Sequence, residues 1–151
     1  MLRRFCSDEA AQLVEFALVL PLLLLVMLGI AEFGFIFQRY EVLTNAAREG
    51  ARIAVLPGYT TADVQARVAS YVTAGRVPTT AGSPGNPVVL VETIAIPVGG
   101  GLPDLAAKRV TVTYTYTYTF IPGIGAMFGA AYNTVLLTAV SEMRSEIIAG
   151  I

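Results

Sequence analysis

The chain has 151 residues, of which 55% are hydrophobic and 14% are charged, and its formal net charge at pH 7 is -1. This length leaves room for one domain, and the net charge gives no electrostatic reason to bind nucleic acid. The chain has no histidine and one cysteine, so the usual general base and most zinc sites are absent. We therefore expect no nucleic-acid partner and no disulfide within the chain.

An apolar segment over residues 11–37 dominates the N-terminal part of the chain. No charged residue lies between Glu15 and Glu32, and up to Phe37 the segment holds about 22 mostly apolar residues, or roughly 33 Å of helix. This length is enough to cross a bilayer, because the hydrocarbon core is about 30 Å thick. The pattern predicts a transmembrane helix.

Two arginines, Arg3 and Arg4, precede the apolar segment. The positive-inside rule then places residues 1–10 in the cytoplasm and the rest of the chain on the other side of the membrane. Cys6 also lies before the segment. We interpret it as a reduced cytosolic thiol.

Residues 38–56 are predicted to continue the same helix in amphipathic form. Small or apolar residues recur there at steps of three and four, at Tyr40, Leu43, Ala47, Ala51 and Ala54. Pro57 and Gly58 end the pattern. We expect one helix whose first half lies in lipid and whose second half packs on a head formed by residues 57–151.

A second helix is predicted at the start of the head. Thr60 can cap it, and Gly75 ends it. Its predicted buried stripe consists of Val64, Val68, Tyr71 and Val72.

Three strands are predicted after the second helix, at residues 88–96, 108–120 and 134–143, with a short helix as the alternative for the last. In the segment 108–120, apolar or aromatic residues alternate with threonines up to Thr119, which predicts one face against a helix and one face in water. Each element then has one apolar face to bury. The predicted fold class is α+β: a long N-terminal helix on a small head with a second helix and an antiparallel sheet of about three strands.

Glu15 is the most unusual residue of the apolar segment. A carboxylate inside a membrane span costs up to roughly 3 kcal/mol at the bilayer centre and tends to be paired. The segment itself supplies no cation. A free amino terminus of a neighbouring subunit is one possible partner, and a carboxylate that reaches the interface and stays in water is the alternative.

Three stretches resemble one known family: Glu15-Phe16 at the start of an aliphatic run that contains Pro21, residues 29–33, and Ala46-Ala47-Arg48-Glu49-Gly50-Ala51-Arg52-Ile53-Ala54. Together they are similar to the TadE-like pseudopilins of the tight-adherence (Tad) pilus, a branch of the type IV pilus superfamily. Residues 139–146 look similar too. The resemblance implies a pilin-like fold.

The resemblance also implies processing by a prepilin peptidase. In such families the cut falls five residues before the glutamate, which here lies between Ala10 and Ala11 and makes Glu15 the fifth residue. Ala10 stands where glycine is usual. In the assembled pilus, Glu15 of one subunit would then neutralise the Ala11 amine of the next subunit.

The implied partners are other pilus subunits, the prepilin peptidase, the inner-membrane assembly platform and membrane lipid. Because this chain has a predicted head, whereas the major pilin typical of Tad systems is headless, the resemblance implies a minor subunit. Such a subunit would sit in the inner membrane as a single-pass protein until it initiates or caps the pilus at low copy, and would support adhesion. Its final location would be the cell surface.

The motif residues Arg48, Glu49, Gly50 and Arg52 allow two interpretations. They could form a contact between subunits, or they could be the wet face of an amphipathic helix with Gly50 allowing close packing on the sheet.

Neither enzyme activity nor a cofactor or metal is expected, because the serines have no histidine to activate them and the carboxylates are scattered. Two other functions compete with the pseudopilin. The first is an uncleaved single-pass envelope protein that scaffolds a secretion or pilus machine, which Ala10 favours. The second is a secreted binding domain released after Ala31, because Gly29-Ile30-Ala31 has the small-x-small form of a signal-peptidase site.

Overall fold

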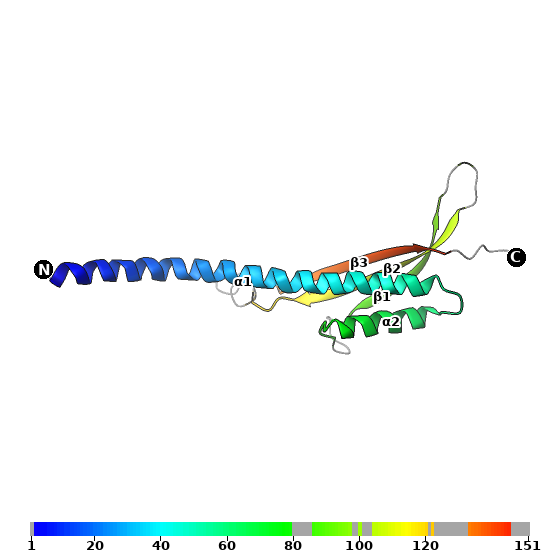
Figure 1. Cartoon of the computed structure of the whole chain (residues 1–151), viewed down its shortest axis with the longest axis horizontal. Coiled ribbons are helices and arrows are strands. Elements are labelled where there is room, and N and C mark those ends of the chain that lie inside the picture. The colour runs from blue at the N-terminus through cyan, green and yellow to red at the C-terminus, as the bar shows by residue number, and fades with distance from the viewer. Residues whose placement is uncertain are drawn as a thin grey trace. The chain divides into compact units, whose positions relative to one another are not determined.

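The computed structural model describes residues 2–79, 86–97, 100, 104–120, 122 and 133–145, with side chains from residue 10 onward. The side chains of Arg3, Arg4 and Cys6 and the end of the 139–146 stretch lie outside the described residues. Figure 1 shows the helices α1 (Leu2–Ala54) and α2 (Thr61–Ala74) and the strands β1 (Val88–Ile96), β2 (Leu105–Thr117) and β3 (Thr134–Arg144). These elements confirm the predicted α+β class.

The chain forms two compact units, and α1 contributes to both. The first unit comprises Met1–Phe35 with Tyr118–Asn133, and the second comprises Ile36–Thr117 with Thr134–Ile151. The division predicted from the sequence, with boundaries after residues 10, 37 and 56, stays a prediction.

The second unit contains one antiparallel sheet in the order β1-β2-β3. Val110 of β2 lies opposite Val91 of β1 and Ser141 of β3. The buried side chains at the centre of β2 are Val110, Val112, Tyr114 and Tyr116, and the threonines between them are half-exposed. The predicted alternation is therefore confirmed, and residues 134–143 are a strand and not a helix.

The end of β2 differs from the prediction. The strand closes at Thr117, so Tyr118 and Phe120 do not belong to it. The Tyr118 N–H still donates to Asn133 O at 3.0 Å, but the N–H groups of Thr119 and Phe120 donate to a side chain, that of Glu32. Because these N–H groups donate to a side chain and not to the backbone of a neighbouring strand, Thr119 and Phe120 do not extend β2.

Helix α2 begins with a complete capping box. Thr60 accepts from the Asp63 N–H at 3.3 Å, and the Asp63 carboxylate accepts from the Thr60 N–H at 2.8 Å, so two otherwise unsatisfied donors are paired. Val64, Val68 and Val72 are buried, whereas Tyr71 is 39% exposed. The prediction that Tyr71 joins the buried stripe is wrong, because the stripe follows steps of four residues and Tyr71 is offset from it.

The C-terminal half of α1 and helix α2 run antiparallel and in close contact (Figure 1). A Cβ added at Gly50 would lie 2.6 Å from Val68 Cγ2 and 3.2 Å from Val110 Cγ1, and one added at Gly75 would overlap the side chain of Val42. Gly50 therefore lies where α1, α2 and β2 converge.

The buried residues of α1 in the second unit are mostly small. They are Leu43, Ala46, Ala47, Gly50, Ala51 and Ile53. Tyr40 is 43% exposed, although it falls on the same steps of three and four residues as Leu43 and Ala47.

Polar contacts also join the elements of the second unit. Gln65 Nε2 of α2 donates to Val89 O of β1 at 3.2 Å, and Arg39 Nη1 of α1 donates to Arg76 O at 3.2 Å. The Tyr114 hydroxyl donates to Pro78 O at 3.2 Å. These bonds tie both helices and the loop after α2 to one another and to the sheet.

We predict that Gly50→Val destabilises the second unit by about 1–3 kcal/mol, because the added atoms overpack a junction of stiff β-branched side chains. Chemical unfolding of the detergent-solubilised chain, followed by tyrosine fluorescence, measures this. The matched control is Gly34→Val, also on α1, where an added Cβ has nothing within 4 Å. Equal stability of the two variants would contradict the prediction.

Candidate functional site

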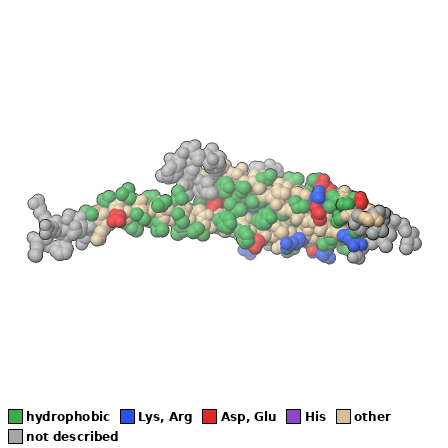
Figure 2. All heavy atoms as spheres, turned by 90° about the horizontal axis from the view of Figure 1, so that it is seen from above, with side chains coloured by type: hydrophobic (Ala, Val, Ile, Leu, Met, Phe, Trp, Pro, Cys, Tyr) green, Lys and Arg blue, Asp and Glu red, His purple; other side chains and the backbone are tan. Residues whose placement is uncertain are grey.

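The N-terminal part of α1 is an exposed apolar cylinder. From Ala10 onward the helix contains an 18-residue window of mean hydropathy 2.7 that is 0% buried, and it is long and apolar enough to cross a membrane. Leu18 is 75% exposed and Ile30 is 70% exposed. Figure 2 shows hydrophobic side chains over most of the described surface of this stretch. Because exposed apolar area costs about 25 cal/mol per Å² in water, this surface needs a bilayer or a protein partner.

Glu15 lies on this exposed surface. Among the described residues, the ion pairs join Glu49 to Arg52 and Arg67, and Arg109 to Glu142, so none of them involves Glu15. Its carboxylate is exposed on a helix segment that otherwise offers mainly apolar side chains. The charge can be neutralised by a group outside the described part of the chain.

The predicted cleavage residues Ala10 and Ala11 are helical and exposed. Ala11 and Glu15 are four residues apart on one helix, so they lie on the same face, one turn from each other. The structure thus has the predicted new amino terminus and the carboxylate on one side of α1.

Glu32 is a functional candidate that sequence reasoning missed, since it served only to mark the end of the uncharged stretch. The residue is 1% exposed, and its carboxylate accepts hydrogen bonds from backbone groups of the first unit. The Thr119 N–H donates to Oε1 at 2.9 Å and to Oε2 at 3.1 Å, and the Phe120 N–H donates to Oε2 at 2.7 Å.

A signal for Glu32 was present in the sequence. The positions three and four residues away on either side are Leu28, Gly29, Phe35 and Ile36, so no cation can pair with the carboxylate along the helix. An acidic residue in such surroundings requires a partner from elsewhere. The identity of that partner, 87 and 88 residues along the chain, had no local signal.

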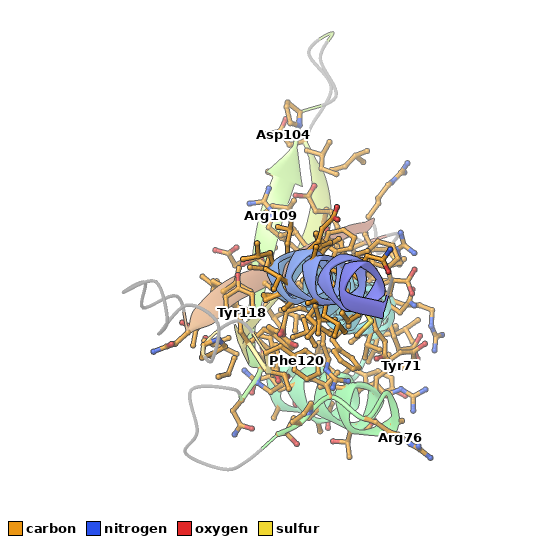
Figure 3. The ribbon with its side chains drawn as sticks, turned by 90° about the vertical axis from the view of Figure 1, so that its left-hand side faces the viewer. Tyr71, Arg76, Asp104, Arg109, Tyr118 and Phe120 are labelled. Atoms are coloured by element: carbon orange, nitrogen blue, oxygen red, sulfur yellow. The ribbon has the colours of Figure 1, made fainter. Side chains whose placement is uncertain are left out.

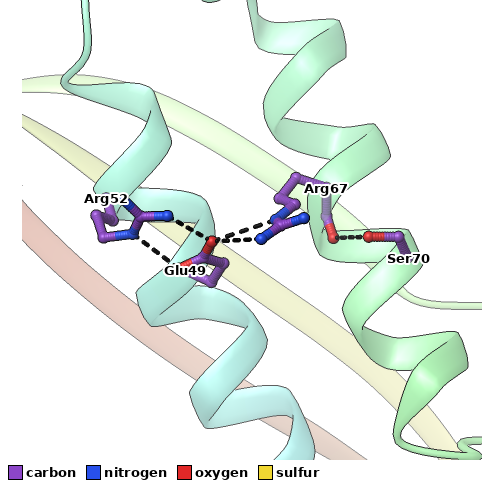
Figure 4. A network of polar contacts seen from close by, with 4 residues as sticks. All are labelled: Glu49, Arg52, Arg67 and Ser70. Carbon is purple, nitrogen blue, oxygen red and sulfur yellow. Dashed lines mark hydrogen bonds and ion pairs between the residues drawn. The ribbon is translucent and has the colours of Figure 1, made fainter.

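Glu49 joins α1 to α2 in the second unit, as Figure 4 shows. Arg52 forms a bidentate pair with it, at 2.9 Å from Nε to Oε2 and 2.8 Å from Nη2 to Oε1. Arg67 of α2 donates to Oε1 from Nε at 3.2 Å and from Nη2 at 3.0 Å. The hydrogen bonds from Arg52 and then Arg67 lower the pKa of Glu49 from 4.5 to about 2.

The other predicted motif residues separate in the structure. Arg48 is exposed and its Nη1 lies 3.5 Å from Asn45 Oδ1 on its own helix, whereas Gly50 is buried. Gly50 therefore belongs to the core, Glu49 is the centre of the ion pairs between α1 and α2, and Arg48 is a cationic position at the surface.

Within the described ranges, no group of three or more His, Cys, Asp or Glu side chains is placed so that it could hold a metal ion.

These features define a pilin-like α+β protein with one N-terminal helix suited to membrane anchoring. Residues 10–52 match the model of the family described as TadE-like protein, which confirms the resemblance seen in the sequence. The matched residues make up less than a third of the 151-residue chain. No curated protein and no solved structure matches the chain.

The match covers the exposed apolar stretch with Glu15 and Glu32, and the motif residues Arg48, Glu49, Gly50 and Arg52. It stops before α2 and the sheet. The candidate functional residues described above are thus concentrated in the part of the chain that matches the family model.

We predict that Glu49→Gln destabilises the second unit by about 1 kcal/mol at neutral pH. The amount is modest because the side chains of Arg52 and Arg67 are about half-exposed. Residues 38–54 lie outside the segment proposed to span the membrane. Since the folded-state pKa of Glu49 lies below 4.5, its contribution is complete above about pH 5 and is lost as the pH falls toward 2.

The free energy of unfolding, measured against pH for both chains, tests this. The difference between wild type and Glu49→Gln should shrink between pH 5 and 2, and Glu41→Gln, an exposed carboxylate on the same helix, should show no such difference. A gap that does not change with pH would refute the role of the charge.

Proposed function

We propose that the chain is a minor pseudopilin of a Tad-type pilus. It is held in the inner membrane by α1, with residues 1–10 in the cytoplasm and the second unit in the periplasm, until it enters the pilus at low copy to initiate or cap assembly and to support adhesion. The observation that carries the proposal is the exposed apolar surface of α1 with the carboxylate of Glu15 on it, inside the residues that match the TadE-like family.

Assembly exchanges one apolar surrounding for another. When α1 leaves the bilayer, lipid contacts are replaced by contacts with the apolar helices of neighbouring subunits. Glu15 cannot stay unpaired in such a bundle, because an isolated charge in a low dielectric is costly. The Ala11 amine of a neighbouring subunit, created by cleavage after Ala10, supplies the opposite charge, and the pair sets the stagger between subunits.

The partners follow from this mechanism. The prepilin peptidase creates the amine, the inner-membrane assembly platform extracts the helix, and the other pilus subunits provide the bundle. The motif residues Glu49 and Gly50 support pilus assembly indirectly, because they hold α1 against α2. Exposed Arg48 is the motif residue that is available for a contact with another subunit.

A second candidate is an uncleaved single-pass scaffold of a secretion or pilus machine. Ala10 in place of glycine at the cleavage position is the specific observation that favours it. The two functions differ in the mature amino terminus.

We predict that the chain recovered from membranes begins at Ala11 only when the host's prepilin peptidase is present. N-terminal sequencing and intact mass measure this, and Ala10→Gly should be processed at least as completely. A chain that begins at Met1 in both strains would favour the scaffold, and one that begins at Glu32 would identify a secreted domain.

We predict that Glu15→Leu leaves cleavage and membrane insertion intact but removes the protein from sheared pili, because the charge pair with the Ala11 amine is lost. Immunoblots of membrane and pilus fractions measure both. Glu41→Leu, outside the apolar span, is the matched control and should enter pili normally. Normal incorporation of Glu15→Leu would exclude the proposed pair.

A further inference from the structure

A cluster in the first unit joins the chain after β2 to α1. Glu32 binds the backbone of Thr119 and Phe120, as described above, and the rings of Phe35 and Phe120 lie 6.3 Å apart between centroids, at 38°. Figure 3, which looks along the molecule from its N-terminal side, shows Phe120 close to α1. The cluster thus combines a buried carboxylate with an aromatic pair.

The Glu32 carboxylate accepts the hydrogen bonds from the N–H groups of Thr119 and Phe120 that water or a neighbouring strand would otherwise accept. Two adjacent N–H groups with no backbone acceptor are costly away from water, and so is a carboxylate at 1% exposure. Bringing them together satisfies both, and bonds from N–H to an ionised carboxylate are about twice as strong as neutral ones. The arrangement is suited to a place where little water is available.

The position of Glu32 on α1 marks such a place. The predicted span over residues 11–37 is about 40 Å long, which matches a bilayer with its two interfacial regions. Glu32 lies about 8 Å before the outer end of this span, so it lies near the level where α1 leaves the hydrocarbon. Next to it, Phe33 is 69% exposed and Phe35 is 40% exposed, and these rings continue the apolar surface of the span. On helices that lie in the bilayer interface, phenylalanine is one of the residues that insert into the boundary between headgroups and acyl chains.

We infer that Glu32 is a positioning residue that holds Phe120 beside α1 in the interfacial region of the phospholipid bilayer. Phe33, Phe35 and Phe120 form a second, peripheral contact with lipid in addition to the span itself. The inference rests on the proposed insertion of α1. Its occupant is phospholipid because the cluster is continuous with the exposed apolar surface of the span.

Tryptophan quenching tests the inference, because the chain contains no tryptophan and Phe120→Trp introduces a unique indole. The full chain is reconstituted in vesicles of phosphatidylethanolamine and phosphatidylglycerol with lipids brominated at a shallow or a deep acyl position. The indole at position 120 should be quenched more by the shallow label. With Glu32→Ala added, this quenching should be lost, and with Glu32→Gln it should be partly retained, because the amide keeps one carbonyl acceptor.

Two controls separate this inference from the proposed function. Leu24→Trp, made in a separate chain, reports insertion of α1, and its quenching by the deep label should not depend on Glu32. If the indole at position 24 is unquenched, the insertion itself fails. If that indole is quenched and the one at position 120 is not, the lipid contact alone is overturned.

Two further measurements distinguish positioning of Phe120 from a general effect of Glu32 on stability. Glu41→Ala should leave the indole at position 120 quenched. Glu32→Ala should not move the unfolding midpoint of the second unit. Persistent quenching at position 120 in the Glu32→Ala chain would overturn the positioning role. Emission from position 120 that responds to protein density and not to brominated lipid would assign the site to a neighbouring copy, which also overturns the lipid contact.

Discussion

A carboxylate in apolar surroundings has to be fully hydrogen-bonded or paired with a cation, and Glu15 and Glu32 of the first unit meet this requirement differently. Glu32 is satisfied inside the chain by the backbone of Thr119 and Phe120. Glu15 is exposed and takes part in none of the ion pairs among the described residues. On α1, the carboxylate of Glu32 is thus satisfied within the chain, whereas that of Glu15 is the one for which we propose a partner in another subunit.

The second unit shows how neighbouring residues of one motif can serve different ends. Gly50 removes a side chain, so that α1 approaches Val68 of α2 and Val110 of β2. The same approach brings Arg67 within hydrogen-bond distance of Glu49. Because the ion pair depends on the close packing, Glu49 and Gly50 act together, while Arg48 stays at the surface.

The elements of the second unit follow from local patterns, and for that reason the sequence predicted them well. The segment 88–96 became β1, and Thr60 and Gly75 bound α2, because alternation, capping and turn residues act over a few positions. Partners distant in the chain leave no such pattern. The strand prediction extended to Phe120, since nothing in its alternation reveals that Glu32, 88 residues away, takes over its N–H group.

The bond from Gln65 to Val89 has a consequence for the edge of the sheet. β1 is an outer strand, and outer strands expose backbone groups that can recruit a strand from another molecule. Here Gln65 Nε2 of α2 already occupies the Val89 carbonyl. A second chain that adds to this edge has to displace a side chain held by its own helix, which gives β1 a built-in competitor against edge-to-edge aggregation.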